Sequence, residues 1–260
     1  MISVENVSKQ FTRPGTGFWP RHAELVPAVK DVSFCAADGQ ITGLLGANGA
    51  GKTTTLRMIA ALLKQDGGQI LVDGVTVSAG QQLTQMHMGV LSDARGLYPR
   101  LSARENIVYY GVLHGMSREQ ANQRAEVLSD ILELKPFIDR RCDGFSQGEK
   151  MKTALARALV HDPKNIILDE PTNGLDVLAT RALREFLRWL RSPQGGGKCI
   201  IFSTHIMQEV ERLCDHVVVI AAGATVAQGS VQALLEQTGE TDFESAFVKL
   251  AFATDKGSAA

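Results

Sequence analysis

The chain has 260 residues, of which 44% are hydrophobic and 21% are charged, and its formal net charge at pH 7 is −1. This length can form one large α/β domain, or a core with a small lobe, around a sizeable buried interior. The near-neutral charge gives no general electrostatic reason to bind nucleic acid or an anionic membrane. The 4 cysteines lack C-x-x-C pairing, which favours buried thiols in a reducing compartment over disulfides or zinc ligands.

Residues 1–40 are predicted to be β-rich, and residues 1–7 alternate like a strand without the apolar core of a signal peptide. Residues 12–27 stand apart, with three prolines, two glycines and Trp19 between two predicted strands. This segment is either a surface loop that Trp19 pins to the protein or a contact with a membrane partner. The longest apolar stretch, residues 217–222, is too short to span a bilayer, so a membrane pathway would need another polypeptide.

The most informative segment lies between a strand-like run at residues 41–45 and a helix-like run at residues 54–63. It matches the phosphate-binding pattern G-x-x-x-x-G-K-[ST] in the strand, loop and helix context that this pattern requires. Backbone N–H groups of such a loop turn inward around phosphates, and the helix N-terminus adds partial positive charge. Lys52 would reach the β- and γ-phosphates, and the Thr53 hydroxyl would coordinate Mg²⁺. The alternative is a plain glycine-rich turn. The predicted nucleotide-binding residues here are Gly46, Ala47, Asn48, Gly49, Ala50, Gly51, Lys52, Thr53 and Thr54.

Two later strands end in groups suited to phosphoryl chemistry. Residues 165–171 are predicted to include a buried strand of the parallel-sheet kind, in which the apolar run 166–168 leads into Asp169 and Glu170. Ligands of open α/β sheets bind at the carboxyl ends of strands, so Asp169 would fix the waters of Mg²⁺ and Glu170 would polarise the attacking water. His205 follows the strand predicted at residues 199–202, within reach of a γ-phosphate. Glu170, His205 and Lys52 are therefore the predicted catalytic residues.

The segment between these motifs, at about residues 86–160, is predicted to be a helical lobe hinged on the core. Ser102 and Ser117 each begin a capping box, which predicts helices reaching residue 114 and about residue 134. Ser146 and Glu149 form a third capping box, at the start of a helix over residues 149–161. The start of this helix also suits an anion, because a free helix N-terminus carries partial positive charge.

The C-terminal part is predicted to continue the alternation of helices and strands. Apolar spacing at Phe243, Phe247 and Leu250 predicts a helical tail, and residues 257–260 are expected to be disordered. The predicted organisation is a nucleotide-binding domain at residues 1–235 and a C-terminal helical tail at residues 236–260. The other helices predicted in this part are at residues 178–191 and 206–213, and the last strand is at residues 217–220.

In this order the motifs resemble those of the nucleotide-binding subunits of ABC transporters, from residue 2 to about residue 229. Residues 173–176 resemble the D-loop of that family, and residues 145–149 resemble its signature motif, usually written L-S-G-G-Q. The resemblance implies an α/β fold, with a P-loop NTPase core on a mainly parallel sheet, an N-terminal antiparallel β subdomain and an inserted helical subdomain. It implies ATP and Mg²⁺ as ligands and hydrolysis of ATP coupled to transmembrane transport.

The same resemblance implies the partners. A separate integral membrane subunit would hold this cytoplasmic chain on the inner face of the cell membrane. A second copy would bind head to tail in the presence of ATP, and no nucleic acid partner is expected. Ser146 and Gly148 would bind the γ-phosphate held by the opposing copy, although Gln147 and Glu149 replace the usual glycine and glutamine. The lysines that follow Glu149 are expected to offset its charge.

Two further residues take roles from the family. Phe11 lies where the family places an aromatic ring against adenine, but it could equally be a core aromatic, or Trp19 could take its place. Asp93 occupies the position of the Q-loop glutamine. It is expected to hold Mg²⁺ through water, with a side chain that only accepts hydrogen bonds and is one methylene shorter.

The sequence leaves more than one transported substrate possible. Residues 90–99 and 114–116 resemble the ATPase subunits of NatAB-type sodium exporters, which implies export of sodium. An exporter of a drug, lipid or polysaccharide is the alternative. A soluble ABC ATPase acting on nucleic acid or ribosomes is a further alternative, but such chains usually carry long coiled-coil insertions or two ATPase halves.

Overall fold

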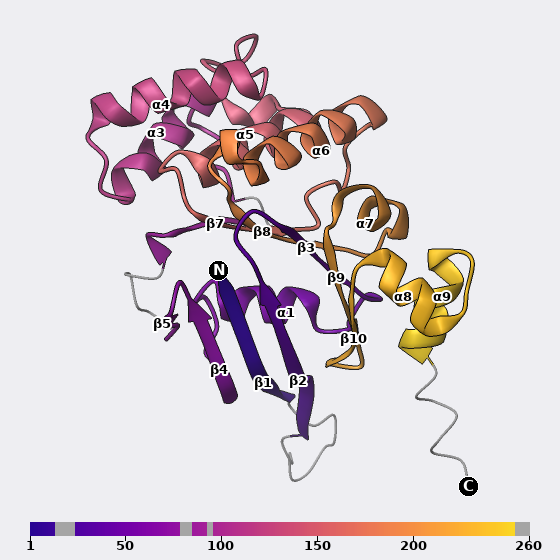
Figure 1. Ribbon diagram of the computed structural model, residues 1–260. Helices are drawn as coiled ribbons and strands as arrows, with labels where there is room; N and C mark the ends of the chain where they lie inside the picture. Colours follow the sequence, from indigo (N-terminus) through magenta and orange to yellow (C-terminus); the bar gives the residue numbers. More distant parts are fainter. Residues whose placement is uncertain (14–23, 79–84, 93–95, 253–260) are drawn as a thin grey trace, which may run out of the picture.

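The computed structural model describes residues 1–13, 24–78, 85–92 and 96–252 (Figure 1). Its strands form one sheet in the order β5-β4-β1-β2-β10-β9-β3-β8-β7-β6. The pair of Ala224 and Asp31 joins an antiparallel half to a mainly parallel half. This architecture confirms the predicted fold class, a P-loop-type α/β core with an N-terminal antiparallel β subdomain.

The antiparallel half contains β1 (Ile2–Arg13), β2 (Glu24–Ala36), β4 (Gly67–Val72) and β5 (Val75–Thr76). β1 pairs with both β2 and β4, and β5 extends the edge beyond β4. In β1, Ile2 and Val4 are buried at alternate positions, and Val7 is buried after an irregularity at Asn6, where φ is 48°. The alternation predicted for residues 1–7 therefore holds as far as Val4, and the register shift between Val4 and Val7 displaces it by one residue.

The second half forms the centre of the molecule. Its strands β3, β8, β7 and β6 run parallel, and every residue of the first three is buried, which explains their continuous apolar sequences. Leu45 pairs with Thr204, and Asp169 pairs with Ser203, so the carboxyl ends of three strands meet at one edge. The strands of this half are β3 (Ile41–Leu45), β6 (Met88–Leu91), β7 (Asn165–Asp169), β8 (Cys199–Thr204), β9 (His216–Ala221) and β10 (Ala224–Gly229).

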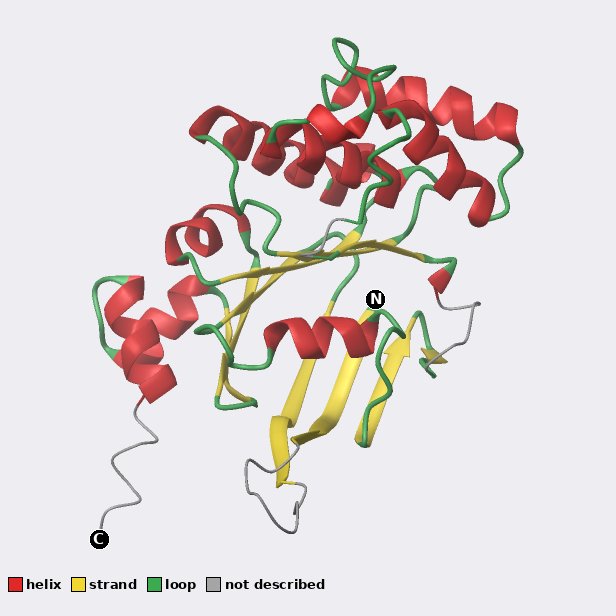
Figure 2. Ribbon diagram, turned by 180° about the vertical axis from the view of Figure 1, so that it is seen from behind, coloured by secondary structure: helices red, strands yellow, loops and turns green. Residues whose placement is uncertain are grey.

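Helix α1 (Lys52–Ile59) lies between the two halves of the sheet, as Figure 2 shows. Leu56 and Ile59 belong to one buried apolar cluster with residues from both halves. The helix begins two residues before the predicted run at 54–63 and ends earlier, because the backbone at Ala61 turns into the left-handed region with φ 56°. Burial on both sides fixes α1, and with it the loop that precedes it.

The opposite face of the central sheet is covered by α3 (Ala103–Leu113), α4 (Arg118–Ile131), α5 (Gln147–Leu159) and α6 (Val177–Arg191), which gather on one side in Figure 1. Capping boxes begin α3, α4 and α5, as the sequence predicts. The short 3₁₀ helix η1 (Cys142–Gly144) leads into α5. The predicted helical range of 86–160 includes β6, which lies in the sheet.

The C-terminal part wraps beside β9. It contains α7 (Met207–Leu213), α8 (Val231–Thr238) and α9 (Phe243–Phe252), and α8 continues past residue 235, the predicted end of the nucleotide-binding domain. The short 3₁₀ helix η2 (Pro193–Gly195) follows α6. Phe243 and Phe247 are buried, so the predicted tail packs on the core over its described length. Residues 257–260 lie outside the described residues. Within the described ranges, none of the helices has the length and apolar character needed to cross a bilayer.

Candidate active site

The loop at residues 46–51 links β3 to α1 and packs tightly against neighbouring backbone. A side chain at Gly46 would place its Cβ 2.3 Å from the Ile220 carbonyl oxygen. At Gly51 the Cβ would lie 2.8 Å from the Ala28 carbonyl oxygen, and the backbone there has φ 107°. Both positions require glycine for close approach, and the second also requires it for conformation. The loop is thus shaped by its contacts with β2 and β9 before any ligand binds.

Lys52 lies across this loop. Its Nζ donates to the carbonyl oxygens of Gly46 at 2.8 Å and Ala47 at 3.3 Å, and it lies 3.7 Å from Glu170 Oε1. The side chain is almost fully buried. Burial lowers the pKa of Lys52, and the charges of Glu170 and Asp169 partly oppose that shift. The ammonium therefore stands between the loop and an acidic strand end, where phosphate oxygens can replace carbonyls as acceptors.

Asp169 ends β7 beside two hydroxyl groups. Ser203 Oγ donates to Asp169 Oδ1 at 2.6 Å, and Thr53 Oγ1 donates to the same oxygen at 3.2 Å. Asp169 and Ser203 are buried. A carboxylate and a threonine hydroxyl side by side suit Mg²⁺, which is bound by one or two protein groups with water and phosphate oxygens completing its octahedron. The residues present therefore fit the metal predicted for this site.

Glu170 follows in a strained conformation. Its φ is 48°, in the left-handed region that non-glycine residues seldom adopt. Its backbone N–H is held by Ser203, with the carbonyl oxygen at 3.2 Å and Oγ at 3.1 Å. His205 Nδ1 lies 2.9 Å and 3.1 Å from the two carboxylate oxygens. This turn aims the carboxylate away from β7, between Lys52 and His205.

A cavity of about 440 Å³ opens at this edge of the sheet. It brings together the phosphate loop, Glu170 and His205, which the sequence analysis selected separately. Asp169 lies directly behind its wall, in hydrogen-bond contact with Thr53. The lining residues are Ala28, Asn48, Gly49, Gly51, Lys52, Thr53, Thr54, Glu170, Asn173 and His205.

The predicted signature residues lie elsewhere. Ser146 caps α5 in the helical layer, and neither it nor Gly148 lines the cavity. Glu149 Oε2 accepts from the Ser146 backbone N–H at 2.8 Å, and Glu149 Oε1 accepts from Arg140 Nη1 at 3.1 Å. The expectation that following lysines offset Glu149 is wrong for Lys152, because its Nζ donates to Glu133 Oε2 at 2.8 Å. Arg140, which the sequence analysis did not single out, takes that role.

Phe11 lies near the end of β1 opposite Val26, and its side chain is 43% exposed. It does not line the cavity, and Lys9 Nζ lies 5.9 Å from the centroid of its ring. A stacking role for Phe11 thus stays a prediction. Asp93 and Trp19 fall outside the described residues.

The sequence analysis gave no role at this site to Ala28 or Ser203, and it placed Asn173 only in the segment that resembles the D-loop. Ala28 and Asn173 line the cavity from β2 and from the turn after β7, and Ser203 holds both acidic residues. The position of Ser203, two residues before His205 on a buried strand, is a signal that would have found it, because alternate residues of a strand share a face. Ala28 carries no such signal.

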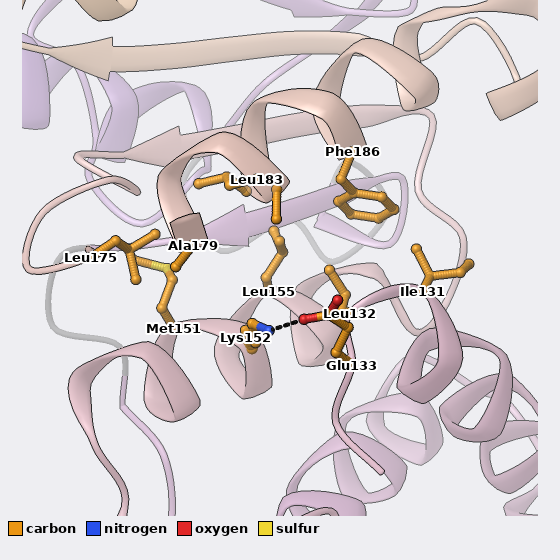
Figure 3. Close-up of a pocket in the computed structure, with 11 residues that line it drawn as sticks. Ile131, Leu132, Glu133, Met151, Lys152, Leu155, Leu175, Ala179, Leu183 and Phe186 are labelled. Atoms are coloured by element: carbon orange, nitrogen blue, oxygen red, sulfur yellow. Dashed lines mark hydrogen bonds and ion pairs between the residues drawn. The ribbon is translucent and has the colours of Figure 1, made fainter. Parts of the chain in front are cut away.

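A second, smaller cavity of about 60 Å³ lies between α5 and α6 beside Leu175 of the turn after β7 (Figure 3). Met151, Leu155 and Ala179 are among its mainly apolar lining residues, with the Lys152–Glu133 ion pair beside them. It offers no phosphate-binding group other than Lys152, which is already paired. It is therefore a packing gap between two helices rather than part of the nucleotide site.

Comparison with known proteins agrees with this site. The family model of the ABC transporter matches residues 29–173. The chain is 42% identical over 249 residues to the ABC transporter ATP-binding protein NatA of Bacillus subtilis strain 168, covering 95% of this chain and 97% of that protein. It is 39% identical over 209 residues to the Nod factor export ATP-binding protein I of Rhizobium sp. strain N33, covering 80% of this chain and 68% of that protein.

Among solved structures, a dimeric bacterial ABC transporter cassette superposes with a TM-score of 0.78 at 25% sequence identity, covering 88% of this chain and 98% of that one. The similarity in sequence and in fold thus extends over most of the chain and includes both the phosphate loop and the acidic strand end. The chain belongs to the ABC transporter family, as an ATP-binding subunit with ATPase activity.

Proposed function

We propose that this ATPase powers export through a separate integral membrane subunit, by closing and reopening a pair of identical copies around ATP. The observation that carries the proposal is the convergence of Lys52, Glu170 and His205 on one cavity of about 440 Å³ behind the phosphate loop. That set of groups suits in-line attack of water on a γ-phosphate. Family membership favours a membrane partner over nucleic acid.

In this proposal each group has one task. Backbone N–H groups of the loop and the Lys52 ammonium bind the β- and γ-phosphates. Thr53 and Asp169 hold Mg²⁺, which supplies positive charge to the phosphate oxygens when bound. Glu170 accepts a hydrogen bond from the attacking water and polarises it. His205, 2.9 Å from that carboxylate, keeps it oriented and contacts the γ-phosphate from the other side.

The second copy supplies the missing side of the site. The described cavity is open and has no signature residue in its lining. A head-to-tail pair would bring Ser146 and Gly148 of the second copy to the γ-phosphate, at the positive end of α5. The similarity to a dimeric cassette supports this arrangement. The pair would sit at the inner face of the cell membrane, bound to the membrane subunit.

For the transported substrate we propose sodium. The support is the resemblance of residues 90–99 and 114–116 to the ATPase subunits of NatAB-type sodium exporters, together with 42% identity to NatA over nearly the whole chain. Export of a larger organic molecule is the second candidate, favoured by 39% identity to a Nod factor export ATP-binding protein.

The test requires the membrane subunit, which we expect to be encoded beside this gene. Both proteins are reconstituted in liposomes with ATP on the outside and a sodium-sensitive dye inside. Sodium should accumulate with the native chain and not with Lys52→Ala, which removes the phosphate-binding charge. Accumulation that is equal with both chains would refute ATP-driven transport. ATP hydrolysis without sodium movement would refute sodium as substrate and leave the ATPase assignment intact.

A further inference from the structure

The signature segment carries a negative charge at the place where the proposed function needs an anion to bind. Glu149 is fixed there because it completes the capping box of α5. Its Oε2 accepts from the Ser146 N–H at 2.8 Å, and its own N–H donates to Ser146 Oγ at 3.2 Å. The hydrogen bond from the Ser146 backbone, with help from Arg140, holds the pKa of the Glu149 carboxyl below its ordinary value. The carboxylate is therefore ionised at neutral pH.

A second anion at one helix N-terminus is unfavourable, because both compete for the same partial positive charge. The side chain that compensates Glu149 is Arg140, whose Nη1 donates to Glu149 Oε1 at 3.1 Å. Lys152 is committed to Glu133 at 2.8 Å. The two carboxylate oxygens of Glu149 thus have separate partners, one on the backbone and one on the guanidinium.

The position of Arg140 is itself well determined. It lies in the segment between α4 and η1, where its N–H donates to the Phe137 carbonyl oxygen at 2.9 Å and its carbonyl oxygen accepts from the Ala103 N–H at 3.2 Å. Its guanidinium carbon is 5.7 Å from the centroid of the Phe145 ring, the residue just before the cap. Backbone anchoring and a cation–π contact therefore hold the guanidinium against the signature segment.

We propose that Arg140 is a positioning residue of the signature motif, which neutralises Glu149 and keeps it in the cap so that the start of α5 can bind the γ-phosphate held by a second copy. The inference rests on the proposed function, in which two copies share each nucleotide. It explains how this chain tolerates an acid where the family usually has glutamine. It also assigns a role to a residue outside the motif itself.

The test measures ATP-driven pairing in a chain that carries Glu170→Gln to suppress hydrolysis. Arg140→Ala, Glu149→Gln and the combination of both are added to this background. The dissociation constant of the dimer is measured by light scattering at saturating ATP, and the affinity of the monomer for ATP is measured with a fluorescent analogue. Arg141→Ala is the matched control, because it removes a neighbouring exposed arginine.

Arg140→Ala should raise the dimer dissociation constant roughly 25-fold, from about fivefold at each of two sites, as expected for one exposed charge near a helix terminus. The affinity of the monomer for ATP should not change, because that site is built by the phosphate loop. Glu149→Gln should restore pairing in the Arg140→Ala chain, and Arg141→Ala should have no effect. If Arg140→Ala does not fold, Arg140→Gln removes the same charge with a longer side chain.

An equal loss of pairing in the Glu149→Gln background would show that Arg140 acts only through folding, and would overturn the inference. Pairing that is indifferent to Arg140 would overturn it as well while leaving the proposed function standing. A Glu170→Gln chain that binds ATP as a monomer at every concentration, even with the membrane subunit, would overturn the proposed function and this inference together.

Discussion

Glu170→Gln is the most informative single change, because it removes one charge and leaves the shape of the side chain nearly intact. The carboxylate lies 3.7 Å from Lys52 Nζ. Two unit charges at that distance attract by about 4 kcal/mol at an effective dielectric constant of about 20. Losing the charge also removes the largest influence that raises the pKa of Lys52 against burial. The variant should therefore shift the pKa of Lys52 further down while still presenting hydrogen-bonding groups to His205.

The catalytic effect should be larger than the effect on binding. An amide cannot accept the proton of the attacking water, and general-base contributions are typically ~10²- to 10⁴-fold. Phosphate release should fall by that factor. ATP affinity should remain within about tenfold of the native value, because Asp169, Thr53 and the loop are unchanged. With ATP retained and not cleaved, the chain should be trapped as a dimer.

The assay is single-turnover release of phosphate, with light scattering to give the mass in ATP and in ADP. Glu185→Gln is the matched control, since Glu185 makes an exposed ion pair with Arg181 on α6 and should give native rates. Hydrolysis by Glu170→Gln at more than about a tenth of the native rate would refute the role of this carboxylate as the base. Ser146→Arg added to Glu170→Gln should prevent the dimer from forming.

Three other changes test neighbouring features. Ser203→Ala removes the 2.6 Å hydrogen bond to Asp169, so the Mg²⁺ concentration for half-maximal hydrolysis should rise about 10- to 100-fold. An unchanged Mg²⁺ concentration for half-maximal hydrolysis would show that Ser203 does not orient Asp169. Ala179→Val adds two carbon atoms to the cavity of about 60 Å³, whose burial contributes about 1.6 kcal/mol, while the lower helix propensity of valine costs about 0.5 kcal/mol. The free energy of unfolding measured in urea should therefore rise by about 1 kcal/mol. A loss of stability would show that the gap cannot accept the methyl groups. Burial lowers the pKa of His161 to about 4 from its ordinary 6.5, so at pH values between these two the unfolded chain binds a proton that the folded chain does not. The free energy of unfolding should therefore fall as the pH drops from about 6.5 to about 4, and His161→Phe should flatten that slope. A slope that persists in the variant would assign the pH dependence to other groups.

Several motifs and elements of this protein could be predicted from residues close together in the chain. The phosphate loop needs eight consecutive residues, and the capping boxes of α3, α4 and α5 need four each, so both are visible without any knowledge of the fold. The strands that end at Asp169 and Thr204 are buried on both faces and therefore appear as continuous apolar runs. These local patterns were sufficient to predict the family and the α/β architecture.

The tertiary structure decided which groups touch. Ser203 meets Asp169 because β7 and β8 are neighbours in register, and Ala28 reaches the loop because β2 crosses beside it. Arg140 meets Glu149 because the chain folds back between α4 and α5, while Lys152, nearer in sequence, points toward Glu133. Charges only 3 Å apart can be far apart in sequence, and residues on one helix can face different ways. Sequence spacing therefore located the chemistry of the site, and packing between distant segments determined its geometry and its charge balance.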